Sequence, residues 1–197
     1  MLEKKAPHIL TGTHQLIDPS FGHDVETIEL DLGCGKGGLT MELADRHPER
    51  LILAADIKIS RLQKINNKSF QAGHANIETI KTLGWDLIGR HLPDNSIDRI
   101  HVVCPDPWPK TNHRPNRMLS SEFIARMGTI IKPGGTLHLA TDDLPYLEWI
   151  LEAIKDIPFF KRDDSLIADV KDIQTEFKIR WAKENKDTHH MGFLCTK

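Results

Sequence analysis

The order of hydrophobic and polar residues along the chain predicts strands that alternate with helices. Short apolar runs with the length of buried strands occupy residues 27–32, 51–56, 77–82, 97–104 and 136–141. Amphipathic patterns of helical period follow at residues 39–44, 58–68, 121–131 and 142–154. Continuously apolar strands joined by helices are typical of a parallel sheet that is covered on both faces. We therefore predict an α/β fold with a doubly wound, mostly parallel sheet and helices on both faces.

No linker, repeat or low-complexity segment divides this pattern, so a single domain over residues 1–197 is expected. Residues 1–26 form a loosely patterned N-terminal arm, residues 27–177 the core, and residues 178–197 a C-terminal segment. The hydrophobic content of 39% is sufficient for one sizeable core. Residues 132–135, with the sequence Lys-Pro-Gly-Gly, predict a turn before the last strand.

A glycine-rich loop lies between the first predicted strand and its helix. Gly33 and Gly35 allow a tight turn and a close approach of a ligand to the backbone, next to the unpaired N–H groups of a helix N-terminus. Asp56 ends the next strand about 20 residues further on, where such sheets present a carboxylate to ribose hydroxyls. The loop and the acid together indicate a site for a nucleotide-type cofactor.

A second candidate site follows the fourth strand, in the run Cys104-Pro105-Asp106-Pro107-Trp108-Pro109-Lys110. Each proline fixes its own φ and is expected to push the preceding residue into an extended conformation. A held carboxylate at Asp106 beside the indole of Trp108 suits a nucleobase, which it contacts on one edge while the ring stacks. Residues 110–117 contain no acid, and we expect Lys110, Arg114 and Arg117 to contact RNA phosphates.

Charge, cysteines and hydropathy restrict the choice of partners. The net charge is −2, so nucleic-acid binding requires a local basic patch, at residues 110–117 or on the basic face of residues 58–68. The cysteines have no C-x-x-C spacing, and we expect no metal site. No apolar run has membrane-spanning length and the first residues do not resemble a signal peptide, so a soluble, cytoplasmic protein without a membrane partner is expected.

These motifs resemble the Rossmann-like S-adenosylmethionine-dependent methyltransferases and, within them, the bacterial tRNA (guanine-N7-)-methyltransferases. The resemblance covers residues 27–177. Its most specific part is residues 105–110 with His113 and Arg117, followed by residues 132–135 and 138–142. It implies methyl transfer from S-adenosyl-L-methionine to N7 of a guanine in the variable loop of tRNA, by a monomer or homodimer.

The resemblance also implies roles for individual residues. It places the amino-acid end of the cofactor at Asp31 and its ribose at Asp56, and makes Asp106 the catalytic acid. The other implied cofactor contacts are Gly33, Gly35, Ile57, Leu83, Gly84 and Asp106 itself. The implied substrate contacts are Lys110, Arg114, Arg117, Asp142, Thr175, Glu176, Phe177 and Lys178.

Three departures from the family pattern are visible. The loop after Trp108 has fewer basic residues, Lys178 stands at an acidic position of the T-x-F-E-like motif, and Leu83 replaces an acid that faces the adenine. These departures concern tRNA specificity and the adenine contacts.

Three other functions are weighed against this one. Gly33, Gly35 and Gly38 satisfy the G-x-G-x-x-G pattern of dehydrogenases, but Asp31 would repel a pyrophosphate and attract the ammonium of S-adenosylmethionine. Residues 106–108 also resemble the D-P-P-aromatic motif of enzymes that methylate exocyclic amines, although Trp108 replaces the second proline. A non-catalytic cofactor-binding or RNA-binding relative that acts as a partner subunit is the remaining alternative.

Overall fold

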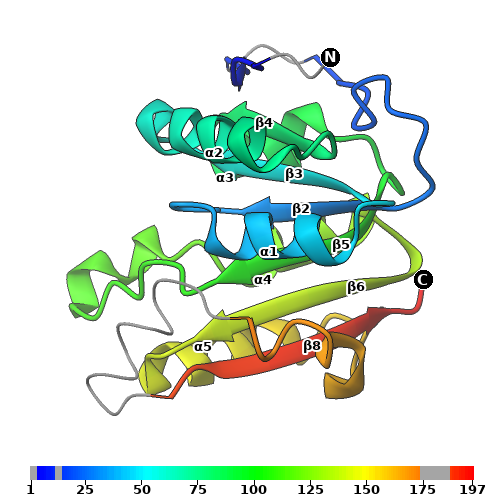
Figure 1. Cartoon of the computed structure of the whole chain (residues 1–197). Coiled ribbons are helices and arrows are strands. Elements are labelled where there is room, and N and C mark those ends of the chain that lie inside the picture. Colours follow the sequence, from blue (N-terminus) through cyan, green and yellow to red (C-terminus); the bar gives the residue numbers. More distant parts are fainter. Residues whose placement is uncertain (1–3, 12–14, 174–186) are drawn as a thin grey trace.

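The computed structural model describes residues 4–11, 15–173 and 187–197. Its strands form one sheet with the order β1-β4-β3-β2-β5-β6-β8-β7 (Figure 1). The strands are β1 (His8–Ile9), β2 (Ile28–Leu32), β3 (Leu51–Asp56), β4 (Ile77–Lys81), β5 (Ile97–Val103), β6 (Ile131–Thr141), β7 (Phe160–Arg162) and β8 (His189–Cys195). The helices are α1 (Gly38–Arg46), α2 (Ile59–Ala72), α3 (Gly84–Asp86), α4 (Ser121–Ile130) and α5 (Leu144–Ile154), with short turns η1 (Leu87–His91), η2 (Thr111–Asn116) and η3 (Asp164–Ile167).

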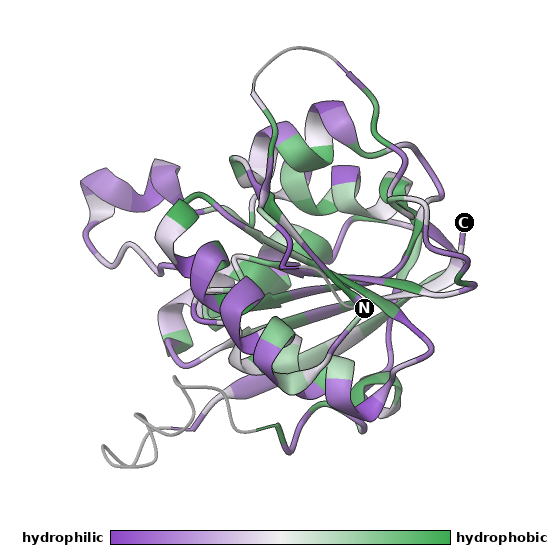
Figure 2. Cartoon of the chain, turned by 45° about the horizontal axis from the view of Figure 1, so that its top comes forward, coloured by the Kyte–Doolittle hydropathy of each residue, from purple (hydrophilic) through white to green (hydrophobic). Residues whose placement is uncertain are grey.

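Strands β1 to β6 pair in parallel, whereas β8 runs antiparallel to β6 and to β7. One apolar cluster joins the sheet to α4, α5 and η1, and a second joins its other face to α1, α2 and η3. Figure 2 shows hydrophobic residues gathered on the central strands and hydrophilic residues on the outer helix surfaces. The predicted doubly wound, mostly parallel sheet with helices on both faces is confirmed. The strand order reverses between β2 and β5, and open α/β sheets bind ligands at such a point.

The structure extends the predicted pattern at both sheet edges. Strand β1 lies in the arm that we interpreted as loosely patterned, and β7 and β8 were not predicted. Residues 132–135 lie within β6, where Ile97 pairs with Ile131 but Arg99 pairs with Thr136, so the strand bulges where we expected a separate turn. Gly134 has a φ of 80°, which explains the glycine at this bulge.

The N-terminal arm is fixed to the sheet edge by one buried acid. Glu78 on β4 accepts hydrogen bonds from Lys5, from His8 at 3.0 Å and from His23 at 2.8 Å. His8 also packs on the ring of Phe21, with centroids 4.3 Å apart. Burial alone would raise the pKa of Glu78, but its three partners lower the pKa below the ordinary value.

A chain of polar side chains crosses the sheet inside the molecule. Glu29, His101 and His138 lie on β2, β5 and β6, each joined to the next by a 2.9 Å hydrogen bond, and His138 makes another of 2.9 Å to His190 on β8. Arg50 donates to Glu29 at 2.6 Å. Burial would raise the pKa of Glu29, but the hydrogen bond with His101 and the nearby arginines lower it to about 2. Burial lowers the pKa of His138 well below 6.5.

We expect this network of hydrogen-bonded side chains to make the protein less stable in mild acid. Below pH 6.5 the unfolded His138 binds a proton that the folded protein excludes, so the free energy of unfolding falls as the pH falls. The slope approaches about 1.4 kcal/mol per pH unit where His138 is protonated in the unfolded protein and still neutral in the folded protein. Glu29 contributes nothing to this range, because its stabilisation is lost only as the pH falls from 4.5 toward about 2. Urea denaturation at several pH values measures the slope.

His138→Asn is the matched variant, because asparagine keeps polar atoms but has no titrating group in this range. It should be less stable at pH 7 and show a flatter pH dependence between pH 6.5 and pH 5. Identical slopes in the two proteins would contradict the assignment to His138.

Candidate active site

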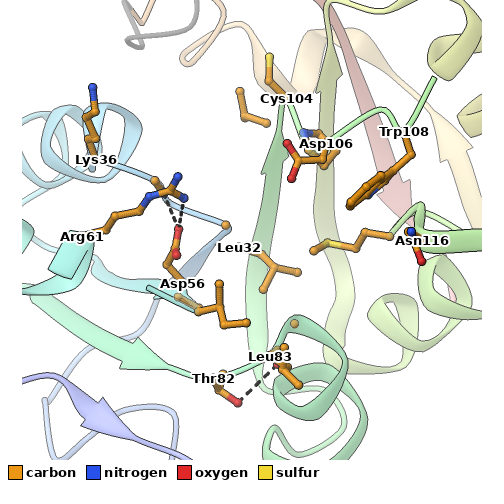
Figure 3. Close-up of a pocket in the computed structure, with 18 residues that line it drawn as sticks. Leu32, Lys36, Asp56, Arg61, Thr82, Leu83, Cys104, Asp106, Trp108 and Asn116 are labelled. Carbon is orange, nitrogen blue, oxygen red and sulfur yellow. Dashed lines mark hydrogen bonds and ion pairs between the residues drawn. The ribbon is translucent and has the colours of Figure 1, made fainter. Parts of the chain in front are cut away.

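A cavity of about 450 Å³ opens at the carboxyl ends of the central strands, at the point where the strand order reverses (Figure 3). It brings together residues that are far apart in the sequence. The predicted site residues that line it are Gly33, Gly35, Asp56, Ile57, Leu83, Gly84 and Asp106. Lys36, Arg61, Asn116 and Met118 also line it and were not predicted as site residues.

The glycine loop turns in the left-handed region of backbone space. Gly33, Gly35 and Gly37 have φ values of 80°, 57° and 82°, which L side chains rarely adopt. A Cβ on Gly37 would also lie 2.6 Å from Cγ1 of Ile65, so the loop packs directly against α2. The loop therefore brings bare backbone to the cavity, directly before the N-terminus of α1.

Asp56 is held at the end of β3 by three donors. Its Oδ1 accepts from the Lys58 amide at 2.7 Å, and its Oδ2 accepts from the Gly35 amide at 3.2 Å and from Nη1 of Arg61 at 3.0 Å (Figure 3). Because a carboxylate has about four lone-pair directions and three donors occupy three of them, it can accept about one further hydrogen bond, from a ribose hydroxyl. Arg61 could have been suspected from its place five residues after Asp56 in a basic helix.

Asp31 lies behind the glycine loop, outside the residues that line the cavity. It is buried, and its carboxylate accepts from Oγ1 of Thr40 on α1 at 2.6 Å. Burial raises its pKa above the ordinary value. Asp31 therefore does not face solvent, and its contact with the cofactor's ammonium stays a prediction.

Two exposed apolar side chains border the same cavity. Ile57 is 55% exposed and Leu83 is 53% exposed, both unusually high for large aliphatic residues. They follow β3 and β4, which are neighbours in the sheet. Apolar groups at the mouth of a cavity suit the faces of a flat ring such as adenine.

The proline-rich segment does not adopt the backbone that its prolines predicted. Cys104 and Trp108 precede prolines, yet their φ values are 49° and 44° rather than extended. The Cys104 amide donates to the Ala140 carbonyl at 2.8 Å, and the Trp108 ring meets His113 edge-on with centroids 5.8 Å apart. These contacts outweigh the local preference, at a cost of about 1–3 kcal/mol for each left-handed residue.

The carboxylate of Asp106 is exposed and lies beside Trp108. Figure 3 shows both side chains across the cavity from Asp56 and Arg61. Within the described part of the chain, no side-chain hydrogen bond or ion pair occupies Asp106. Its oxygens therefore remain available to accept hydrogen bonds from a ligand while the indole offers a stacking surface.

Arg117 has a different environment from the one that we expected. It is 6% exposed, its Nε donates to the Pro107 carbonyl at 2.8 Å, and its guanidinium lies 4.9 Å from the Tyr146 ring and 5.1 Å from the Trp149 ring. A buried guanidinium that contacts two rings and the Pro107 carbonyl is poorly placed to meet phosphates, so we revise its expected role to holding the Asp106 segment. Tyr146 and Trp149 are placed by α5, which no sequence motif connects to Arg117.

The other predicted substrate residues lie around the mouth or outside the described residues. Lys110 and Arg114 are exposed on η2 or next to it. Asp142 does not line the cavity but lies beside Cys104, whose pKa burial and this carboxylate raise to about 12. The predicted contacts Thr175, Glu176, Phe177 and Lys178 fall outside the described residues.

Two further properties concern the described residues only. No group of three or more His, Cys, Asp or Glu side chains is arranged there to hold a metal ion. None of the helices described is both long and apolar enough to cross a membrane.

Comparison with known proteins agrees with the fold and with the motifs. The tRNA (guanine-N(7)-)-methyltransferase of Polaromonas naphthalenivorans is 33% identical over 149 residues, which cover 76% of this chain and 60% of that protein. The enzyme of the same name from Nitrosospira multiformis is 34% identical over 66% of this chain and 56% of its own length. The chain thus spans little more than half of the length of these relatives. Their similarity confirms the resemblance that we stated from the sequence.

Among solved structures, the 16S rRNA methyltransferase KamB has a TM-score of 0.66 at 19% identity, covering 88% of this chain and 89% of its own. A Haemonchus contortus phosphoethanolamine N-methyltransferase in complex with S-adenosyl-L-methionine has a TM-score of 0.59 at 13% identity, covering 90% of this chain and 50% of its own. These likenesses show the fold. Residues 25–191 match the protein family described as "Putative methyltransferase", and the chain belongs to this methyltransferase family.

Proposed function

We propose that this protein transfers a methyl group from S-adenosyl-L-methionine to N7 of a guanine in tRNA. The observation that carries the proposal is the exposed carboxylate of Asp106 beside Trp108, which shares a cavity with the glycine loop and Asp56. The similarity to tRNA (guanine-N(7)-)-methyltransferases supports the choice of substrate and atom.

The features of the cavity suit this cofactor. Asp56 is placed to accept from ribose hydroxyls, and Ile57 and Leu83 offer apolar contacts to adenine. Buried Asp31 and the N-terminus of α1 lie next to the glycine loop in the chain, where the resemblance puts the amino-acid end of the cofactor. A dinucleotide fits less well, because the negative charge of Asp31 behind the loop disfavours a pyrophosphate.

The proposed reaction does not require the protein to remove a proton from the attacking atom. Guanine N7 carries a lone pair and no proton, so it attacks the sulfonium methyl without a general base. The base becomes cationic as the thioether leaves, and catalysis rests on positioning and electrostatics. Asp106 accepts from the guanine N1–H and the exocyclic amine, and these hydrogen bonds strengthen as positive charge develops.

Replacing Asp56 by Ala should weaken cofactor binding about tenfold or more, because a charged hydrogen bond contributes about 1.5 to 3 kcal/mol. Calorimetric titration with S-adenosyl-L-methionine measures the change. Asp94→Ala is a matched control, since Asp94 also pairs with an arginine, Arg126, but lies outside the cavity. Equal affinities of the wild type and Asp56→Ala would place the ribose elsewhere.

The overall proposal is tested by incubating the protein with methyl-labelled S-adenosyl-L-methionine and total tRNA. Label should enter tRNA in repeated turnovers. Tight binding of NAD with no binding of S-adenosyl-L-methionine would overturn the cofactor assignment. Cofactor and tRNA binding without transfer would instead indicate a non-catalytic relative.

A further inference from the structure

Exposed lysines gather on α2 and on the glycine loop beside it. Lys58, Lys64 and Lys68 are exposed on α2 or at its N-cap, and Lys36 is exposed in the loop. We call these four lysines the α2 basic face. Residues 57–77 contain no Asp or Glu at all, although the whole chain has a net charge of −2.

Several contacts orient this face toward the mouth of the cavity. Arg61, on the same side of α2, reaches the cavity and pairs with Asp56 at 3.0 Å. Nζ of Lys68 donates to the carbonyl of Lys36 at 3.2 Å, and Lys36 lines the cavity directly after Gly35. Because residues three or four apart share a helix face, Lys64 lies between Arg61 and Lys68 on this side.

The lysines of this face have no acidic partner within the described part of the chain. Some cations elsewhere are neutralised by an acid, such as Arg126 by Asp94 at 2.6 Å and Lys132 by Asp98 at 2.8 Å. On the neighbouring helix α1, Glu42 pairs with Arg46 and is thus occupied elsewhere. The positive charge of the α2 basic face is therefore available to an outside anion.

We propose that the α2 basic face binds phosphates of the tRNA, on the opposite side of the cavity mouth from Lys110 and Arg114. Figure 3 shows Lys36 and Arg61 on one side of the cavity and Asp106, Trp108 and Asn116 on the other. The RNA thus spans the mouth, held on both sides, while one base enters beside Trp108. This arrangement offsets the small number of basic residues in residues 110–117. The inference rests on the proposed function for the identity of its RNA.

The test is the double variant Lys64→Gln and Lys68→Gln, which leaves every cavity-lining residue unchanged. Its affinity for tRNA at about 0.1 M salt should fall about tenfold, and the slope of log affinity against log salt should flatten by about one to two units. Its calorimetric affinity for S-adenosyl-L-methionine should not change. Lys155→Gln with Lys161→Gln is the control, a pair of exposed lysines after α5 and on the edge strand β7, and its slope should match that of the wild type.

The inference would be overturned if the double variant had the same salt slope and the same tRNA affinity as the wild type. It would also be overturned if the wild-type protein did not bind tRNA. Failure of the proposed function is distinguishable, since it is read from methyl transfer by the wild type. If the wild-type protein binds tRNA with a steep salt dependence but transfers no methyl group, the proposed function is wrong. The binding curves of the variants still decide the role of the α2 basic face in that case.

Discussion

Replacing Asp106 by Asn should lower the single-turnover rate of methyl transfer to tRNA about a hundredfold or more. The amide keeps the shape of the side chain and one acceptor oxygen, but it removes the charge that opposes the developing purine cation. Loss of one preorganised electrostatic group costs about 2.7 kcal/mol or more in the transition state. The rate is measured at saturating cofactor and tRNA, so that binding does not limit it.

The Asp106 variant should fold normally, because its side chain is exposed and has no partner among the described residues. Its affinities for S-adenosyl-L-methionine and for tRNA, measured separately, should remain close to those of the wild type. Asp94→Asn is a control acid that lies outside the cavity and should not affect the rate. An Asp106→Asn enzyme with a normal rate and reduced cofactor affinity would make Asp106 a binding residue.

Replacing Arg117 by Leu should lower the rate at saturating substrates about tenfold or more and also destabilise the fold. The buried guanidinium holds the Pro107 carbonyl and packs on Tyr146 and Trp149. Removing it leaves a carbonyl without its donor next to Asp106, and a charged hydrogen bond of this kind contributes about 1.5 to 3 kcal/mol. Urea denaturation and single-turnover kinetics measure the two effects.

A salt titration separates this positioning role from a phosphate contact. Arg117→Leu should keep the wild-type slope of tRNA affinity against salt, whereas Arg114→Leu, on the exposed part of η2, should flatten it by about one unit and leave the saturated rate unchanged. Arg117→Lys, which keeps a cation over the rings, should recover part of the rate. A flattened slope with a normal saturated rate in Arg117→Leu would restore Arg117 to the phosphate contacts.

The sequence was sufficient to predict the central sheet and several residues that line the cavity. Apolar runs such as residues 51–56 are buried on both faces, and this pattern specifies a parallel strand without reference to distant residues. Gly33, Gly35 and Asp56 were recognisable because a backbone turn and a strand-end carboxylate are local features. The single-domain organisation and the contacts of all the predicted site residues with a cofactor or substrate stay predictions.

The elements that were missed depend on contacts between distant parts of the chain. Strand β1 has two residues and exists because His8 and Ile9 pair with β4, which gives no local pattern to read. The left-handed Cys104 opposes the preference imposed by Pro105 and is stabilised by Ala140. Arg117 was placed among exposed cations because its charge is visible in the sequence, whereas the rings that cover it belong to α5.

The central claim concerns the atom that receives the methyl group, and nucleoside analysis tests it directly. tRNA is incubated with the wild-type protein and S-adenosyl-L-methionine, digested to nucleosides, and examined by mass spectrometry against standards of each methylated base. We predict 7-methylguanosine as the product, formed by the wild type and strongly reduced with Asp106→Asn. A nucleoside methylated on an exocyclic amine, or cofactor turnover with no methylated guanine, would contradict the assignment of guanine N7 as the acceptor.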